Sequence, residues 1–243
     1  MAFKKHIPNF ITLLNLTCGL VSIVFFAEGR LDMAAFLVFL ASMFDFMDGF
    51  FARLLKVYSP LGAQLDSLAD VISFGVAPSL ILFSLIQESH GLPDVRIGQT
   101  NLLPFVALMI PLFTALRLAK FNVDTRQSVS FIGLPSPASG LLLASLPLIK
   151  SQLYSSQSLS YMVFTNTYFY IGLAILMSLL MVSGLPLFGL KFKSFGFKGN
   201  EVRYLFLALA LVLLFSLQFV AIPFIILLYI LFSVVVYLVD IQG

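Results

Sequence analysis

The sequence predicts an all-α integral membrane protein built as a bundle of about eight transmembrane helices. Sixty per cent of its 243 residues are hydrophobic and only 10% are charged, whereas about a quarter of the residues in a soluble domain are charged. The mean hydropathy is +1.05. Its apolar runs approach the ~20 residues that a helix needs to cross a bilayer. Together these observations argue against a soluble globular domain.

The expected membrane helices follow one another along most of the chain. We place them at 10–27, 32–55, 67–87, 101–119, 137–153, 160–183, 203–218 and 220–240. The first run is too long for the apolar part of a cleavable signal peptide, so we expect it to remain as a span. The loop 184–202 is the most natural boundary. It divides the chain into a six-span body, 1–183, and a C-terminal part, 184–243, with a basic juxtamembrane loop and two helices.

The distribution of Lys and Arg predicts the orientation of these helices. With the N-terminus in the cytoplasm, eleven Lys and Arg residues fall in cytoplasmic segments and three fall outside, as the positive-inside rule requires. The net charge of +3 then reflects topology and contact with anionic membrane lipid, and we expect no nucleic-acid partner. We therefore expect a multi-pass protein of a cell membrane, the cytoplasmic membrane of a prokaryote, with both termini in the cytoplasm. The single cysteine, Cys18, excludes an intrachain disulfide.

Four aspartates lie close together in this otherwise apolar chain. An ionised carboxylate at the centre of a membrane helix costs about 2.5–3.5 kcal/mol, so four of them need compensation. Asp45 and Asp48 are three residues apart, and Asp66 and Asp70 are four apart, so each pair shares one helical face. Both pairs lie toward the cytoplasmic ends of neighbouring predicted helices. We expect the four carboxylates to converge in one cleft that opens to the cytoplasm.

Mutual repulsion of these carboxylates predicts a divalent cation in the cleft. Oxygen ligands suit Mg²⁺, Mn²⁺ or Ca²⁺ rather than zinc. Carboxylate-bound Mg²⁺ usually shares its ligand shell with substrate phosphates, which points to phosphoryl chemistry. Gly49 and Gly62 leave room for a bulky ligand beside the backbone, and Arg53 offers a cation to phosphate oxygens.

Simpler interpretations exist for the same residues. Acid pairs in a membrane bundle can form a proton or ion pathway, so an ion-coupled transporter is an alternative of a different class. Transporter sites usually lie near the membrane midplane and often in repeated halves, whereas these acids lie at one face and we find no repeat. Arg53 can be a cytoplasmic anchor, and Gly49 and Gly62 can be helix-packing glycines.

The complete run reads D-x2-D-G-x2-A-R-x8-G-x3-D-x3-D, from Asp45 to Asp70. This run resembles the signature of the CDP-alcohol phosphatidyltransferase family at every one of its eight positions. The resemblance implies an integral membrane enzyme, typically a homodimer, that transfers a phosphatidyl group from a CDP-linked lipid to an alcohol and releases CMP. The acids would then hold Mg²⁺ or Mn²⁺ against the diphosphate, with Ca²⁺ as a further ion that these ligands accept.

The resemblance also implies a role for each position of the signature. Asp45, Asp48 and Asp66 would be metal ligands, and Asp70 would be a ligand or the general base that takes the proton of the acceptor. The positions that would bind CDP are Asp48, Gly49, Ala52, Arg53 and Gly62.

Polar side chains near the start of the first predicted helix add candidates for CDP binding. Asn9, Thr12 and Asn15 recur at intervals of three and lie near enough to the cytoplasm to hydrogen-bond a phosphate or cytidine. For Asn9, directly after Pro8, a helix start is the better interpretation. We therefore keep Thr12 and Asn15.

Two further segments bear on the acceptor. "RLAKFN" (117–122) and "FIGLPSPA" (131–138) resemble "RLARFN" and "FxGLPxPA" of the phosphatidylserine synthase branch of the family. This resemblance implies CDP-diacylglycerol and L-serine as substrates, with Arg117, Lys120 and Asn122 as candidate serine-binding residues. The positive-inside rule explains the basic residues equally well. Glycerol 3-phosphate or an inositol phosphate is the alternative acceptor.

Overall fold

The computed structural model describes residues 6–57, 59–123, 131–154, 159–187, 196 and 200–242. These residues are almost entirely helical, which confirms the all-α prediction. The elements are α1 (His6–Ala27), α2 (Leu31–Leu54), α3 (Pro60–Asp70), the π-helix η2 (Val71–Val76), α4 (Ala77–Gln87), β1 (Arg96–Ile97), β2 (Thr100–Asn101), the 3-10 helix η3 (Leu103–Leu108), α5 (Met109–Val123), β3 (Phe131–Ile132), α6 (Ser136–Leu153), α7 (Leu159–Phe164), α8 (Thr167–Val182), β4 (Pro186–Leu187), α9 (Glu201–Leu217), the 3-10 helix η4 (Gln218–Val220) and α10 (Ala221–Gln242). Most of the basic loop predicted at 184–202 lies outside the described residues.

Each of the eight predicted apolar runs is helical over most of its length. By length and composition, five described stretches can cross a membrane: His6–Ala27, Leu31–Leu54, Pro60–Gln87, Leu103–Val123 and Glu201–Leu238. The last stretch holds both α9 and α10, which reverse direction near Gln218, a residue with a positive φ of 53°. The chain is thus a multi-pass membrane protein, and the count of eight crossings stays a prediction.

Two helix boundaries differ from the sequence prediction because polar caps override the apolar pattern. The third helix begins at Pro60, not 67, since the Ser59 side chain accepts a hydrogen bond from the Gly62 amide at 3.0 Å and proline favours the first helical position. The sixth run is divided into α7 and α8. Asn166 caps α8 by accepting a hydrogen bond from the Tyr168 amide at 2.8 Å.

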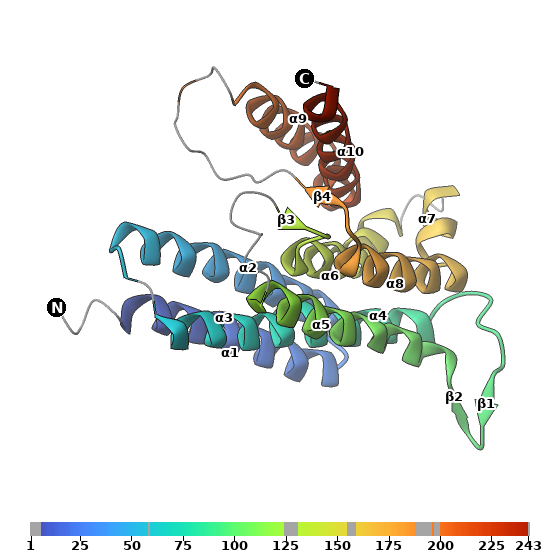
Figure 1. Cartoon of the computed structure of the whole chain (residues 1–243). Helices are drawn as coiled ribbons and strands as arrows, with labels where there is room; N and C mark the ends of the chain where they lie inside the picture. The colour runs from blue at the N-terminus through green and yellow to red at the C-terminus, as the bar shows by residue number, and fades with distance from the viewer. Residues whose placement is uncertain are drawn as a thin grey trace.

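The chain reversals bring distant segments to the same end of the bundle (Figure 1). Helices α1, α2, α3–α4 and α5 run alongside one another, and α6 and α8 lie between them and the α9–α10 hairpin. The beginnings of α1 and α3 and the ends of α2 and α5 meet at one end, which we call the N-terminal end. The β1–β2 hairpin and α7 lie toward the opposite end.

The π-helix η2 is fixed in the core by close helix contacts. Ser73 donates a hydrogen bond to the Asn15 carbonyl of α1 at 3.0 Å. A Cβ on Gly19 would lie 2.9 Å from Ser73 Cα, and one on Gly140 would lie 2.9 Å from Phe74 Cβ. Glycine is therefore required at both positions for α1 and α6 to approach η2. The π-helix directly follows Asp70, and π-turns are frequent at functional sites.

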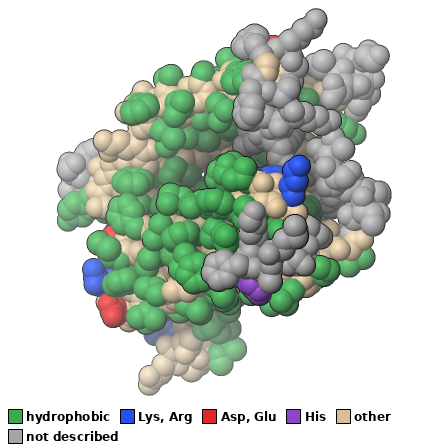
Figure 2. Space-filling model, turned by 90° about the vertical axis from the view of Figure 1, so that its left-hand side faces the viewer, with side chains coloured by type: hydrophobic (Ala, Val, Ile, Leu, Met, Phe, Trp, Pro, Cys, Tyr) green, Lys and Arg blue, Asp and Glu red, His purple; other side chains and the backbone are tan. Residues whose placement is uncertain are grey.

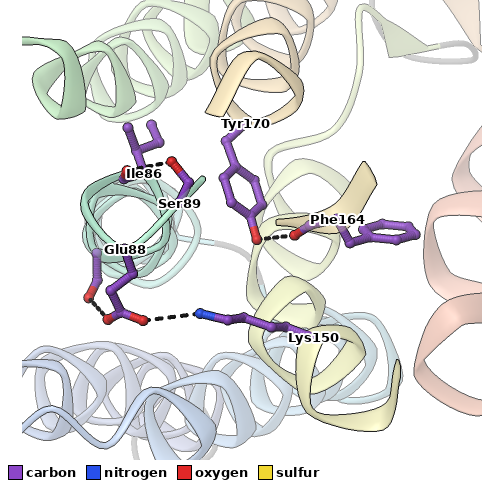
Figure 3. A network of polar contacts seen from close by, with 7 residues as sticks. Ile86, Glu88, Ser89, Lys150, Phe164 and Tyr170 are labelled. Atoms are coloured by element: carbon purple, nitrogen blue, oxygen red, sulfur yellow. Dashed lines mark hydrogen bonds and ion pairs between the residues drawn. The ribbon is translucent and has the colours of Figure 1, made fainter. Parts of the chain in front are cut away.

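A network of paired polar groups lies at the opposite end of the bundle (Figure 3). Glu88 forms an ion pair with Lys150 at 3.1 Å and accepts a hydrogen bond from Ser84 at 3.0 Å. Ser89 donates to the Ile86 carbonyl at 2.6 Å, and the Tyr170 hydroxyl donates to the carbonyl of Phe164. The ion pair joins the end of α4 to α6, and the Tyr170 hydrogen bond joins α8 to the end of α7.

Candidate active site

Three of the four aspartates form a compact carboxylate cluster at the N-terminal end. Asp45 and Asp48 come from the last turns of α2, and Asp66 comes from α3, which runs back after a short loop. One carboxylate oxygen from each lies within 4.8 Å of the other two. Asp48 is buried, and its Oδ2 accepts a hydrogen bond from Thr12 Oγ1 of α1 at 2.6 Å. The structure therefore brings together the side chains that the sequence pattern placed on two neighbouring helices.

Asp70 is not one of that trio, but it interacts electrostatically with all three of its aspartates and is bonded to other groups. It is the last residue of α3 and is buried. Ser136, at the start of α6, donates from Oγ to Asp70 Oδ2 at 3.4 Å and accepts from Arg117 Nη1 at 3.2 Å. Ser136 and Arg117 are also buried. A carboxylate and a guanidinium are thus connected through one hydroxyl, in what we call the Asp70–Ser136–Arg117 chain.

Several buried polar atoms around these groups have no hydrogen-bond partner among the described residues. They include Oδ1 of Asp66, Oδ1 of Asp70, Nε of Arg117 and both side-chain polar atoms of Asn15, and the buried hydroxyls of Ser139 and Ser178 are likewise unpaired. Leaving such an atom unpaired costs about 1–3 kcal/mol, and most buried polar groups in folded proteins are paired. Their concentration here indicates a site that is completed by ligands. A set of clustered carboxylate oxygens with free lone pairs also fits a hard divalent cation.

The candidate CDP-binding residues fall into two groups. Gly49 lies beside the side chain of Arg53, since a Cβ there would be 3.4 Å from Arg53 Nη1. Arg53 is exposed and interacts electrostatically with Asp48, while Ala52 is half-buried on the same helix. Gly62 differs, because a Cβ there would lie 2.9 Å from Asn9 Oδ1. Close packing of α3 on α1 is sufficient to explain that glycine.

The candidate serine-binding residues are separated by the structure. Arg117 and Lys120 line one cavity of about 740 Å³ between the end of α5, β3 and the end of α8. Lys120 is exposed, whereas Arg117 is buried. Asn122 does not line that cavity, and its amide donates to Ser67 Oγ of α3 at 2.9 Å. On this geometry Asn122 holds α5 against α3.

The surface at this end also suits a membrane protein that binds a charged headgroup. Figure 2 looks at the end of the bundle where α1 begins, and hydrophobic side chains cover much of the described surface. Only a few Lys and Arg side chains interrupt them. Among the described residues, few cations lie on this face, and Arg117 is a buried one close to the aspartates.

Sequence reasoning missed Ser136. This residue lies in the "FIGLPSPA" segment, but a serine at a helix start is usually a cap. Its partner Asp70 is 66 residues away, so only the tertiary fold reveals the contact.

Comparison with known proteins finds one family model and several named relatives. Residues 5–186 match the family model described as CDP-alcohol phosphatidyltransferase. A Helicobacter pylori (strain J99) protein named CDP-diacylglycerol–serine O-phosphatidyltransferase is 34% identical over 180 residues, 73% of this chain and 70% of the relative. Relatives of the same name are 35% identical over 178 residues in Methanocaldococcus jannaschii, 73% and 71% of the two chains, and 36% identical over 142 residues in Bacillus subtilis, 58% and 75%.

Proposed function

Because this chain belongs to the CDP-alcohol phosphatidyltransferase family, we propose that it transfers the phosphatidyl group of CDP-diacylglycerol to the hydroxyl of L-serine, giving phosphatidylserine and CMP. The observation that carries the proposal is the carboxylate cluster beside the Asp70–Ser136–Arg117 chain. The cluster suits the diphosphate of the donor. The Asp70–Ser136–Arg117 chain offers a base and a cation to an acceptor that has both a hydroxyl and a carboxylate.

The donor is proposed to bind at the cluster. Asp45, Asp48 and Asp66 would hold Mg²⁺ or Mn²⁺, and such an ion neutralises diphosphate charge and stabilises a phosphate leaving group. Thr12 fixes the rotamer of Asp48 through its hydrogen bond. Arg53, exposed one turn beyond Gly49, is free to approach a phosphate oxygen of CDP. The unpaired amide of Asn15 offers both a donor and an acceptor to the nucleotide.

The acceptor is proposed to bind on the other side of the cluster. Asp70 would take the proton of the serine hydroxyl as its oxygen forms a bond to phosphorus and the bond from phosphorus to the CMP oxygen breaks. Arg117 would hold the serine carboxylate, for which its buried and unpaired Nε is a ready donor. Ser136 links these two groups by accepting from Arg117 and donating to Asp70.

The names of the relatives support serine over the alternative acceptors. Glycerol 3-phosphate and the inositol phosphates carry nearly two negative charges at neutral pH, and a denser cationic pocket would suit them better. The cavity at the end of α5 is lined by Arg117 and Lys120, the two basic residues among those that form it. Family membership also favours an enzyme over the ion-coupled transporter that the acid pairs alone would allow.

The direct test supplies detergent-solubilised enzyme with CDP-diacylglycerol, Mg²⁺ or Mn²⁺, and one acceptor at a time. We expect CMP release and phosphatidylserine with serine, and neither in excess chelator. Formation of phosphatidylglycerol phosphate without phosphatidylserine would reject the serine acceptor and leave the family assignment intact. Full activity in chelator would reject the metal.

We also propose that the N-terminal end of the bundle faces the cytoplasm and that the protein lies in the cytoplasmic membrane as a homodimer in contact with anionic lipid. In a Cys18→Ser background, an impermeant thiol reagent applied to sealed right-side-out cells should label Gln99→Cys, on the exposed β1–β2 turn, and spare Ser128→Cys. The reverse labelling would invert the topology.

Light scattering of the detergent-solubilised protein would test the dimer, and a monomeric mass would reject it.

A further inference from the structure

Helix α7 lies crosswise at the end of the bundle where α6 ends and α8 begins (Figure 1). With six residues it is about 9 Å long, far less than the ~30 Å thickness of a bilayer's hydrocarbon core. The hydrophobic pattern alone assigns these residues to a span at 160–183. Since α7 is too short and turned the wrong way to be part of a span, it occupies another place relative to the membrane.

The two faces of α7 differ in what they contact. Phe164 packs on the apolar core, and its ring centroid lies 5.2 Å from that of Phe169 in α8. Leu159, Met162 and Val163, spaced i, i+3 and i+4, share the other face and are 78%, 65% and 45% exposed. The outward face of a helix in a soluble protein is polar. Here the outward face is apolar, so it needs an apolar environment.

Tyrosines flank this apolar face. Tyr154, directly after α6, and Tyr168, in the first turn of α8, are 70% and 66% exposed. The ring of Tyr161 in α7 packs edge to face on that of Tyr154, with 6.0 Å between centroids. Tyrosine combines an apolar ring with a polar hydroxyl, so it is enriched where a membrane meets water. The tyrosines therefore indicate the headgroup layer of a bilayer and not its hydrocarbon centre.

An open hollow lies between α7 and α8. Its volume is about 360 Å³, and it is lined by Met162, Val163, Asn166 and Phe169. The side-chain oxygen of Asn166 is already engaged, because it accepts a hydrogen bond from the Tyr168 amide at 2.8 Å. The other lining side chains are apolar, so the hollow suits a hydrocarbon chain better than a polar ligand.

The corner between α7 and α8 is held against the end of α4. The amide of His90 donates to the Thr165 carbonyl at 2.9 Å, and the amide of Thr167 donates to the His90 carbonyl at 3.3 Å. The Thr167 hydroxyl donates to the same carbonyl at 3.0 Å. These bonds hold the apolar face of α7 in one orientation, so little ordering is needed when it meets a lipid surface.

We propose that α7 is an interfacial helix, which lies in the membrane–water interface on the side of the bilayer away from the carboxylate cluster. The face formed by Leu159, Met162 and Val163 rests on the acyl chains, and the hollow takes a segment of one chain. Interfacial helices bury their apolar face about 5–10 Å into the boundary between headgroups and acyl chains. The inference is independent of the proposed reaction, because it concerns the opposite end of the bundle.

The length of α8 gives a physical reason for this arrangement. Helix α8 has 16 residues, so it is about 24 Å long, shorter than the ~30 Å hydrocarbon core. A short span leaves a mismatch that flanking residues at the interface must relieve. An apolar helix lying across the end of α8 occupies the depth that α8 does not span.

The test uses the absence of tryptophan from the chain, because a single introduced tryptophan then reports its own surroundings. Met162→Trp is reconstituted in phosphatidylcholine vesicles whose acyl chains carry bromine, a contact quencher, either near the headgroup or near the terminal methyl. Leu176→Trp is the deep control, since Leu176 is 51% exposed and lies about 14 Å along α8 from Thr167. Gln99→Trp, on the exposed β1–β2 turn, is the aqueous control.

We expect bromine near the headgroup to remove about half of the Met162→Trp emission and bromine near the terminal methyl to remove clearly less, because the face lies at shallow depth. The order should be reversed for Leu176→Trp, and neither lipid should quench Gln99→Trp. Val163→Trp, on the same face, is measured in parallel and should behave as Met162→Trp does. The circular dichroism spectrum and thermal midpoint of wild type show which variants are folded.

Three results in a folded variant would overturn the inference. Emission that neither lipid quenches, with the red maximum of Gln99→Trp, would place α7 in water. Unquenched emission with a blue maximum would show that protein, such as a second copy of the chain, covers the face. Stronger quenching by bromine near the terminal methyl, as in Leu176→Trp, would make α7 part of a membrane span.

Discussion

The two ends of this helix bundle both hold charged residues, but they treat them in opposite ways. At the end that holds α7 and the β1–β2 hairpin, Glu88 is paired with Lys150 and Ser84, and Ser89 and Tyr170 both donate to backbone carbonyls (Figure 3). At the N-terminal end, one carboxylate oxygen from each of three aspartates lies within 4.8 Å of the other two. Buried atoms of Asp66, Asp70, Arg117 and Asn15 lack partners there.

This difference separates polar groups that stabilise the fold from those that bind ligands. A paired network satisfies its own donors and acceptors, so it gains nothing by binding a small molecule. An unpaired buried group is costly until something binds it. In a membrane protein that cost is harder to relieve, because water is scarce around the helices. Unpaired polar atoms therefore distinguish the proposed functional end of this bundle more clearly than the number of charged residues does.

The largest expected effect comes from removing one carboxylate charge from the cluster at the N-terminal end. Asp48→Asn or Asp66→Asn takes a ligand from the cluster, so CMP release should fall by at least about 1,000-fold while the protein still inserts in the membrane. Glu88→Gln is the matched control. It also removes one carboxylate charge, and its CMP release should stay within about twofold of wild type. Near-normal turnover in both Asp variants would contradict the assignment of the cluster.

Asp70→Asn is expected to have a smaller effect that falls on one step. The amide cannot take the proton of the acceptor, so transfer should fall by about 10²–10⁴-fold. Binding of CDP-diacylglycerol should change only a few-fold, because Asp70 is not part of the compact trio. Parallel measurements of CMP release and CDP-diacylglycerol binding check this. Equal losses in the two would make Asp70 a metal ligand instead of the base.

Arg117→Ala and Lys120→Ala sharpen the contrast between a buried and an exposed cation. Arg117 is desolvated and Lys120 is exposed, so removal of Arg117 should raise the KM for serine by about tenfold or more and removal of Lys120 by at most a few-fold. Serine titrations of CMP release measure both. A larger effect at Lys120 would indicate that Lys120, and not Arg117, binds the serine carboxylate.

The smallest effect is expected at the opposite end. Lys150→Met removes an ion pair whose side chains are 29% and 52% exposed, so the loss of stability should be about 0.2–1 kcal/mol. Thermal unfolding in detergent should show a slightly lower midpoint, with kcat unchanged. Loss of turnover in a folded Lys150→Met protein would contradict the inference that this end of the bundle serves stability and not catalysis.

The hydrophobic pattern predicted the helices well because burial in lipid is a property of whole segments. It failed where a few polar atoms decide a boundary. The start of α3 was missed because Gln64, Asp66 and Ser67 interrupt the apolar pattern of its first half and its cap, Ser59, lies outside the apolar run. The break between α7 and α8 was missed because a single capping residue, Asn166, lies inside an apolar run.

The acidic cluster was accessible from the sequence because helical spacing of three and four residues is local. The carboxylates of α2 and α3 then needed only one short loop to meet. Ser136 was not accessible, because it lies on a helix whose contact with the site depends on tertiary packing. Asn122 shows the converse. It is close in sequence to Arg117, yet its amide is bonded to Ser67.

The π-helix between α3 and α4 allows one membrane span to serve two different neighbourhoods. An α-helix turns by about 100° per residue, so the wider turn of Val71–Val76 offsets the faces of the span before and after it. Before the turn, Asp66 and Asp70 face polar partners. Beyond it, Ile81, Leu82 and Leu85 enter the apolar core. An uninterrupted α-helix would keep one rotational phase throughout, so the site and the core could not be optimised separately.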